Sequence, residues 1–203
     1  MNLEIDPVRF GAAVEFAAEA HKHQTRKRAD NDSRPRIPYL SHLLAVAGLV
    51  IEDGGDTTEA IAGLLHDYIE DVNWAGATEL TNRFGPEVAA IVEDCTGYKK
   101  EHIPDFRERK QRYLDHLLAD VSDAGIRVSL ADKVHNARST VNDLENDGPT
   151  MWAKFNAGAE DQLWWYDSLT DAYTEHAEAG RADKARVAEL QRLVARMHDL
   201  SGA

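Results

Sequence analysis

The sequence has few of the residues needed for disulfides and no apolar run long enough to cross a membrane. Among its 203 residues there is one cysteine, Cys95, so no disulfide can form within the chain, and we expect a cytoplasmic location. The longest uninterrupted apolar run covers residues 43–51, whereas a bilayer crossing needs roughly 20 residues. Residues 1–6 contain no basic segment followed by an apolar one, so we expect no secretory signal and no membrane partner.

Basic residues are also scarce. The chain has 23 lysines and arginines against 36 aspartates and glutamates, which gives a net charge of −13. This balance argues against general attraction to nucleic acid, because such binding depends on neutralising phosphates with basic side chains. An anionic ligand would therefore need a local basic patch or a bound metal. Hydrophobic residues make up 43% of the chain and charged residues 29%, values that are ordinary for a globular protein.

The hydrophobic pattern predicts an all-α protein, since apolar residues recur at steps of three and four rather than alternating. We expect a single domain over residues 1–203, with a core over about 7–173 and a C-terminal helix over about 182–200. A polar stretch at 26–38 with two prolines is expected to be a loop. The other helices are expected near residues 7–23, 39–53, 57–71, 78–84, 86–95, 106–121, 124–140 and 150–173.

A histidine and an aspartate, His66 and Asp67, stand within an otherwise apolar helical stretch. A buried carboxylate costs several kcal/mol unless it is paired or bound to a cation. Two interpretations remain open from this doublet alone. His66 could pack against the core while Asp67 bonds to a neighbouring backbone group or arginine, or the two could bind a metal at the edge of the helix.

Two further acidic residues, Glu70 and Asp71, follow one turn later. Positions three and four apart are neighbours on a helix, so Asp67, Glu70 and Asp71 can border one pocket. Clustered carboxylates raise one another's pKa, which suits general acid–base chemistry. The alternative is a solvated acidic turn, although negative charge at the C-terminal end of a helix is mildly unfavourable.

More candidate ligands lie elsewhere in the chain. His42 stands near the start of an apolar helix, and Asp132 precedes Asn136 by one helical turn. Taken singly, each is more often structural. Two histidines and two aspartates from separate helices would together form a mixed nitrogen and oxygen site, which suits Mn, Fe or Zn better than Ca or Mg. A helical bundle can direct such side chains inward.

The ordered set of these motifs resembles a known family. The chain is similar to the HD-domain metal-dependent phosphohydrolases, and more narrowly to the hydrolase domain of the RelA/SpoT-type alarmone enzymes and to the stand-alone small alarmone hydrolases. An HD-domain helical bundle is the fold that this resemblance implies. The segments that carry it are residues 16–27, 38–42, 64–71, 84–88, 108–110 and 130–138.

The resemblance also implies roles for individual residues. It implies one divalent ion, usually Mn²⁺, and hydrolysis of the 3′-pyrophosphate of guanosine tetra- or pentaphosphate, the alarmones of the stringent response, to GDP or GTP and pyrophosphate. The matching residues are His42, His66, Asp67 and Asp132 as metal ligands, Glu70 and Asp71 as the pair that activates water, and Arg26, Lys27 and Asn136 in substrate binding, with Arg26 stacked on the base. A local basic cluster around that arginine would hold the anionic substrate: Lys22, Arg26, Lys27, Arg28, Arg34 and Arg36.

Two departures from the family pattern keep other activities open. Extra residues at 28–37 border the expected base pocket, and Tyr68 is bulkier than the residue that is usual there, so it could narrow the pocket. The alternatives are hydrolysis of another phosphorylated nucleotide, such as an adenosine alarmone, a 3′-nucleotide or NADPH, and a catalytically silent module that binds metal or nucleotide and regulates a partner. The sequence leaves the oligomeric state open, with a homodimer among the options.

Overall fold

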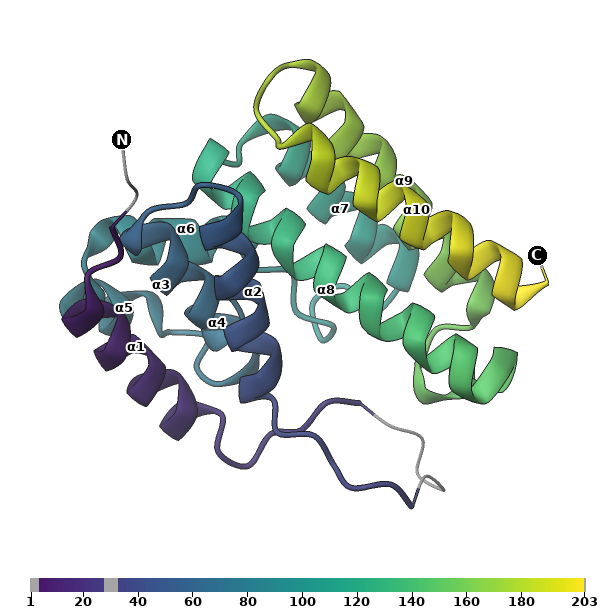
Figure 1. The fold of residues 1–203 in the computed structure, drawn as a ribbon, viewed down its shortest axis with the longest axis horizontal. Coiled ribbons are helices and arrows are strands. Elements are labelled where there is room, and N and C mark those ends of the chain that lie inside the picture. Colours follow the sequence, from purple (N-terminus) through teal and green to yellow (C-terminus); the bar gives the residue numbers. More distant parts are fainter. Residues whose placement is uncertain (1–3, 28–32, 203) are drawn as a thin grey trace. The chain divides into compact units, whose positions relative to one another are not determined.

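The protein is all-α in its computed structural model, which describes residues 4–27 and 33–202 (Figure 1). No β-strand occurs within those ranges, so the expected fold class is confirmed. None of the helices there is long and apolar enough to cross a membrane. The helices are α1 (Pro7–Ala20), α2 (Leu40–Glu52), α3 (Thr57–Leu65), α4 (Tyr68–Asp71), α5 (Ala77–Phe84), α6 (Pro86–Cys95), α7 (Phe106–Ala119), α8 (Asp123–Asp147), the 3₁₀ helix η1 (Gly148–Lys154), α9 (Ala159–Glu178) and α10 (Lys184–Ser201).

The chain divides into two compact units that alternate along the sequence. The first unit contains the described residues up to Arg26, followed by Arg36–Gly97 and Asp120–Asp132. The second contains the rest of the described chain, and the boundary between the two falls within α8. That residues 1–203 form one domain with a core over 7–173 stays a prediction.

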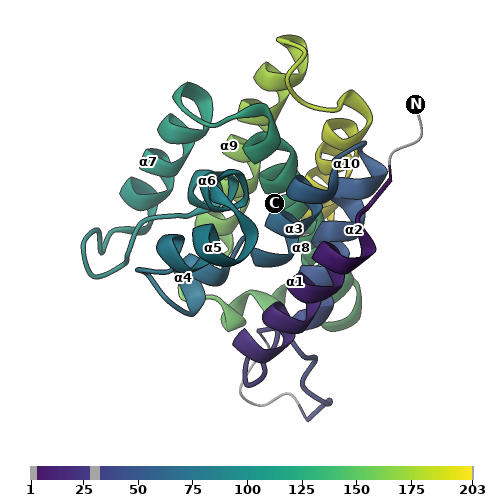
Figure 2. The same cartoon turned by 90° about the vertical axis from the view of Figure 1, so that its left-hand side faces the viewer.

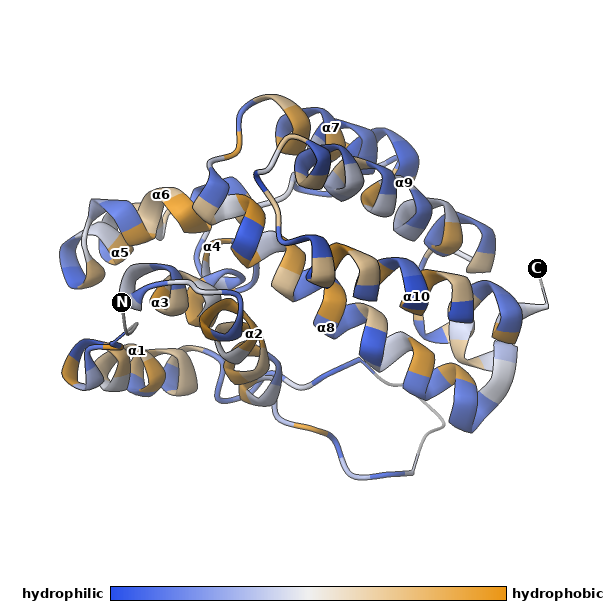
Figure 3. Cartoon of the chain, turned by 45° about the horizontal axis from the view of Figure 1, so that its top comes forward, coloured by the Kyte–Doolittle hydropathy of each residue, from blue (hydrophilic) through white to orange (hydrophobic). Residues whose placement is uncertain are grey.

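Helix α3 lies at the centre of the first unit, where it packs against α1, α2 and α6. Asp56 and Glu59 form a reciprocal capping box at its N-terminus. Gly63 allows α3 to approach α2 closely, since a Cβ at this position would lie 3.2 Å from the Cα of Ala47. Figure 2 shows α1, α2 and α3 side by side, and Figure 3 shows that α2 and α3 are predominantly hydrophobic. The first unit therefore has an apolar core around α3, the helix that directly precedes the His66–Asp67 doublet.

The predicted continuous helix over 57–71 is wrong. Helix α3 ends at Leu65, and the chain turns through His66 and Asp67 before α4 begins at Tyr68. The carbonyl of Gly63, one of the last in α3, lies 2.9 Å from Nδ1 of the His66 side chain. The turn places the doublet at the end of a helix rather than along its side.

The predicted helices over 124–140 and 150–173 also differ from the structure. Helix α8 continues to Asp147, after which Gly148 takes a positive φ of 63° that ends the helix. Residues 148–154 form η1, and α9 begins only at Ala159. In this second unit, α9 packs against α7 and α10 (Figure 1). The predicted C-terminal helix is confirmed as α10.

The two ends of the predicted loop at 26–38 are paired with each other. Thr25 and Pro38 form an isolated antiparallel bridge. The amide of Arg26 donates to the carbonyl of Ile37 at 2.9 Å, and the amide of Tyr39 donates to the carbonyl of Gln24 at 2.9 Å. Residues 24–26 are thereby held beside the start of α2. Arg28 and part of the inserted segment lie outside the described residues.

Candidate metal centre and active site

Four side chains from three parts of the first unit meet at one point. His42 comes from α2, His66 and Asp67 from the turn after α3, and Asp132 from α8. One ligand atom from each of His42, His66 and Asp67 lies within 4.8 Å of the others. The Oδ1 atom of Asp132 lies 3.1 Å from Nε2 of His42 and 3.5 Å from Nε2 of His66. The structure thus brings together all four residues that the sequence singles out as ligands.

These separations fit a shared cation. Ligands at about 2.0–2.2 Å from one ion, at tetrahedral or octahedral angles, lie about 3.0–3.5 Å from each other. The nitrogen-to-oxygen distances in the cluster run from 3.0 Å, between His66 Nε2 and Asp67 Oδ2, to 3.6 Å, between His42 Nε2 and Asp67 Oδ2. Two imidazoles and two carboxylates are a suitable set for a first-row divalent ion. That the cluster binds such an ion stays a prediction.

The tautomer of His66 supports the same interpretation. Its Nδ1 faces the carbonyl of Gly63 at 2.9 Å, so Nδ1 carries the proton and Nε2 of the neutral ring has a lone pair. This Nε2 atom is buried and has no hydrogen-bond partner among the described residues. It faces the carboxylates of Asp67 and Asp132, which are themselves acceptors. Such an arrangement of acceptors is stable only with a proton or a cation between them.

Protons and a metal would compete for this cluster. Burial alone would lower the pKa of His66, but the charges of Asp67 and Asp132 outweigh it and raise the pKa well above its usual range. Burial alone would raise the pKa of Asp67, yet His66 and His42 hold it well below its usual range. The same negative potential that would retain a proton on His66 attracts a divalent cation.

The carboxylate of Asp67 is held from outside the cluster. The hydroxyl of Tyr39 donates a hydrogen bond of 2.5 Å to its Oδ2 atom. Burial, together with the charge of Asp67, raises the pKa of the Tyr39 phenol, so this donor stays protonated. Sequence reasoning assigned Tyr39 no role. Its position three residues before His42, within one of the segments that carry the family resemblance, was the signal that could have identified it.

The two expected water-activating carboxylates are held differently. Glu70 Oε2 accepts a hydrogen bond of 3.1 Å from the backbone amide of Gly97. Asp71 Oδ2 accepts one of 2.6 Å from Nε2 of Gln24. Partial desolvation, followed by the charge of Asp67, raises the pKa of Asp71. Asp71 therefore combines a fixed carboxyl with an increased affinity for protons. Gln24 and Gly97 are further residues that the sequence did not identify.

The expected substrate-binding residues fall in both units. The guanidinium of Arg26 lies 5.7 Å from the centre of the Tyr39 ring, within cation–π range. Lys27 and Asn136 belong to the second unit, Asn136 being four residues after Asp132 in α8. Their roles stay predictions.

The expected basic cluster is partly neutralised by ion pairs. Lys22 pairs with Glu19 at 2.5 Å within the first unit, and Arg34 pairs with Asp147 at 2.5 Å within the second. Arg26, another member of the cluster, lies over the Tyr39 ring in the first unit. The positive charge available for a substrate is therefore smaller than the sequence alone indicates.

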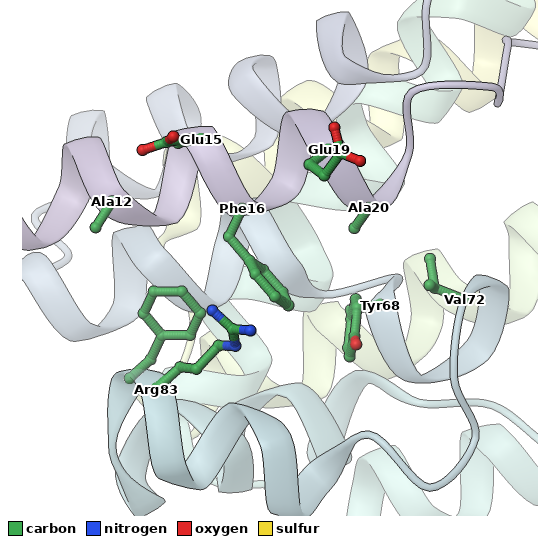
Figure 4. Close-up of a pocket in the computed structure, with 9 residues that line it drawn as sticks. Ala12, Glu15, Phe16, Glu19, Ala20, Tyr68, Val72 and Arg83 are labelled. Atoms are coloured by element: carbon green, nitrogen blue, oxygen red, sulfur yellow. The ribbon is translucent and has the colours of Figure 1, made fainter.

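Tyr68 faces a separate cavity of about 600 Å³ between α1, α4 and α5. Figure 4 shows its ring beside Phe16, with the Arg83 side chain next to Phe16. The Tyr68 hydroxyl donates to Glu79 at 2.6 Å, and the Arg83 guanidinium lies 4.9 Å from the centre of the Phe16 ring. The bulk of Tyr68 thus packs against α1 and α5.

The four-residue cluster at the end of α3 places a histidine–aspartate doublet at the centre of the site. A family model described as the HD domain matches residues 13–162 of this chain. The chain belongs to the HD-domain family. The matched range includes the doublet, His42 and Asp132, so the whole cluster lies within the HD domain.

Several known proteins resemble this HD domain. A Xenopus tropicalis protein named guanosine-3′,5′-bis(diphosphate) 3′-pyrophosphohydrolase MESH1 is 38% identical over 144 residues, covering 70% of this chain and 73% of that protein. A Synechocystis protein named probable guanosine-3′,5′-bis(diphosphate) 3′-pyrophosphohydrolase is 35% identical over 126 residues, covering 61% of this chain but 16% of its own length. The match to the longer relative is therefore confined to a small part of it.

Solved structures show the same fold. A metazoan ortholog of SpoT, described as hydrolysing ppGpp, has a TM-score of 0.70 and 23% identity, over 98% of both chains. The protein lmo0812 from Listeria monocytogenes has a TM-score of 0.67 and 26% identity, covering 79% of this chain and 97% of that one. The expected HD-domain helical fold is confirmed.

Proposed function

We propose that this protein hydrolyses the 3′-pyrophosphate of guanosine tetra- or pentaphosphate, giving GDP or GTP and pyrophosphate. Water adds to the phosphorus attached to the 3′ oxygen, the bond between them breaks, and the 3′ oxygen leaves with a proton. The observation that carries the proposal is the cluster of His42, His66, Asp67 and Asp132 with Glu70 and Asp71 directly after it. The 38% identity to a relative named for this reaction supports the choice of substrate.

The cluster would hold one divalent ion, for which we propose Mn²⁺. When bound, such an ion polarises phosphoryl oxygens and lowers the pKa of a water molecule on it. Mixed imidazole and carboxylate ligands support Mn²⁺ over Mg²⁺, which prefers all-oxygen sites. The carboxylates of Asp67 and Asp132 would neutralise the charge of the ion, and the hydrogen bond from Tyr39 holds Asp67 in place.

Glu70 and Asp71 are proposed to orient and deprotonate the attacking water. Both lie on the short helix α4 directly after Asp67. The raised pKa of Asp71 favours acceptance of a proton from water. Glu70, fixed by the amide of Gly97, can hold the water in line with the phosphorus.

Arg26, Lys27 and Asn136 are proposed to bind the nucleotide. The Tyr39 ring supports the guanidinium of Arg26 on one side. A guanidinium plane can also stack on a nucleobase. Lys27 and Asn136 would add a charged and a neutral donor. A cytoplasmic location stays a prediction.

The proposal is tested by incubating the purified protein and Mn²⁺ with a panel of nucleotides and separating the products by chromatography. The panel contains guanosine 3′,5′-bis(diphosphate), its adenosine counterpart, a 3′-nucleotide and NADPH. We expect GDP and pyrophosphate in equal amounts from the guanosine compound, at a rate well above that of the others. Faster turnover of another member would reassign the substrate. Absence of turnover across the panel, with metal bound, would indicate a binding module instead.

A further inference from the structure

Two side chains between α1 and α2 connect to Asp71 through hydrogen bonds. Nδ1 of His21 lies 2.6 Å from Oε1 of Gln24, and Nε2 of Gln24 donates to Oδ2 of Asp71 at 2.6 Å. All three residues belong to the first unit. The connection therefore runs from a buried histidine, through one amide, to a carboxylate in the proposed site.

The backbone around Gln24 is fixed at both of its polar groups. Its amide donates to the carbonyl of His21 at 2.9 Å, and its carbonyl accepts from the amide of Tyr39 at 2.9 Å. The adjacent bridge between Thr25 and Pro38 holds the same segment against the start of α2. Because the main chain is anchored, the Gln24 side chain has few conformations in which it can reach Asp71.

The hydrogen bonds have a defined direction. An ionised carboxylate only accepts, so the NH₂ group of Gln24 faces Asp71 and its oxygen faces His21. His21 must then carry its proton on Nδ1. Its Nε2 is buried and has no hydrogen-bond partner among the described residues, and the ring stacks on Tyr39 with centres 5.6 Å apart. A proton on Nδ1 of His21 is thus the donor that holds the Gln24 amide with its NH₂ group toward the carboxylate.

We propose that His21 and Gln24 are positioning residues for the hydrolysis: His21 orients the Gln24 amide, and Gln24 binds Oδ2 of Asp71, leaving Oδ1 to accept a proton from water. This inference rests on the proposed function. The physical need for it comes from Asp67 and Glu70, whose negative charges would otherwise push Asp71 out of position. A neutral amide donor holds the carboxylate and leaves its negative charge in place. A lysine or arginine in the same position would neutralise that charge.

The first test replaces Gln24 by Glu, which has nearly the same shape but replaces the NH₂ donor by a carboxylate oxygen and adds a negative charge beside Asp71. Gln24 is half-buried, so the variant should fold. We expect kcat to fall about 10- to 100-fold, with KM and the Mn²⁺ dissociation constant within about twofold of wild type. The matched control is Gln191→Glu, in which an exposed amide loses its hydrogen bond to Thr174 in the second unit. Unchanged kcat in Gln24→Glu would overturn the proposal.

A double-mutant cycle tests whether Gln24 acts through Asp71. The Gln24→Ala change is made in wild type and in the Asp71→Asn background, and kcat is compared. We expect about a tenfold or greater loss in wild type and less than about a twofold further loss after Asp71→Asn. Equal losses in both backgrounds would show that Gln24 acts independently of Asp71, which would overturn the proposal.

The role of His21 has a readout that does not require activity. Long-range ¹H–¹⁵N correlation spectra should show a proton on Nδ1 of His21, whereas a ring with its proton on Nε2 alone would overturn the proposal. These spectra report the position of the His21 proton even if the wild-type protein hydrolyses none of the nucleotides. A failure of the proposed function is therefore distinguishable from a failure of this inference.

The His21→Phe variant keeps an aromatic ring against Tyr39 and removes the Nδ1 donor. We expect a kcat loss similar to that of Gln24→Glu, with KM unchanged. The control is His176→Phe, because His176 is 3% exposed like His21 and its Nε2 lies 3.0 Å from the carbonyl of Leu117 in the second unit. Loss of kcat in proportion to loss of folded protein in both variants would indicate a purely structural role and overturn the proposal. If His21→Phe does not fold, the proposal is tested by the kcat of the Gln24 variants and by the position of the proton on the His21 ring.

Discussion

The hydroxyl of Tyr39 lies 2.5 Å from Oδ2 of Asp67 and donates a hydrogen bond to it. The ring of the same tyrosine lies beneath the guanidinium of Arg26. One residue therefore contacts both a proposed metal ligand and a proposed substrate-binding residue, through different parts of its side chain. The two contacts can be separated by substitution.

Removing the hydroxyl alone should weaken metal binding. Tyr39→Phe keeps the ring under Arg26 but leaves Asp67 without its outer donor. Partners of this kind typically contribute a factor of about 10–100 to metal affinity. We expect at least about a tenfold increase in the Mn²⁺ dissociation constant by calorimetry, and KM unchanged at saturating metal. The control is Tyr68→Phe, which removes a tyrosine hydroxyl one residue after Asp67. It loses the hydrogen bond to Glu79 and should bind metal normally.

Removing a ligand should abolish metal binding and turnover together. Asp132→Ala deletes the carboxylate that lies 3.1 Å from His42 and 3.5 Å from His66. We expect less than about 10% of the wild-type metal content by elemental analysis, and no measurable hydrolysis. Asp94→Ala removes a carboxylate that binds Ser122 in the same unit and should retain metal. Full activity of Asp132→Ala would refute the metal assignment.

Glu70→Gln should separate metal binding from chemistry. The amide can still accept from the Gly97 backbone, so the local structure is maintained, but the negative charge near the water is lost. We expect kcat to fall about 10²- to 10⁴-fold with metal content unchanged. Glu79→Gln, which changes an acidic partner of Tyr68, should alter kcat by less than about twofold. Normal turnover in Glu70→Gln would remove this residue from the mechanism.

Arg26→Ala should act mainly on substrate binding. Its guanidinium is placed over Tyr39, and its loss removes both a charge and a stacking surface. We expect KM to rise about 10-fold or more, with a smaller change in kcat. Arg83→Ala is a matched control, because Arg83 also lies over an aromatic ring, Phe16, at the separate cavity (Figure 4). An unaltered KM in Arg26→Ala would place the nucleotide elsewhere.

The metal-free protein should be stabilised by Asp71→Asn at neutral pH. Partial desolvation and the charge of Asp67 raise the pKa of Asp71 in the folded state above its unfolded value. The ionised carboxylate is therefore destabilising above the folded pKa, and this cost disappears below the unfolded pKa of about 3.9, where both states are protonated. The side chain is partly exposed to solvent, so we expect a gain of at most about 1 kcal/mol at pH 7.

The measurement is denaturant unfolding of wild type and Asp71→Asn after chelation, at pH 7 and near pH 3.5. The Asn side chain can still accept from Gln24, so the hydrogen bond is retained. The difference between the two proteins should shrink toward zero at the lower pH. A variant that is less stable than wild type at pH 7 would contradict the assigned shift.

The sequence predicted most helices because their signals are local. The capping box at Asp56 and Glu59 and the proline at the first position of α6 depend only on residues within a few positions. The break between α3 and α4 had no such signal, since the stretch from Leu65 to Tyr68 contains neither Gly nor Pro. At this break, the side chain of His66 hydrogen-bonds to the carbonyl of Gly63. The same side chain is buried among the other residues of the cluster.

By itself, the sequence determined the fold class and the identities of the residues that could bind a metal, because residue type and helical periodicity depend only on the order of the amino acids. Only the tertiary structure decided that His42, His66, Asp67 and Asp132 share one point, and that Tyr39, Gln24 and Gly97 hold the carboxylates around it. The reason is physical. Hydrogen bonds between residues distant in sequence depend on how helices pack, and packing depends on the whole core at once.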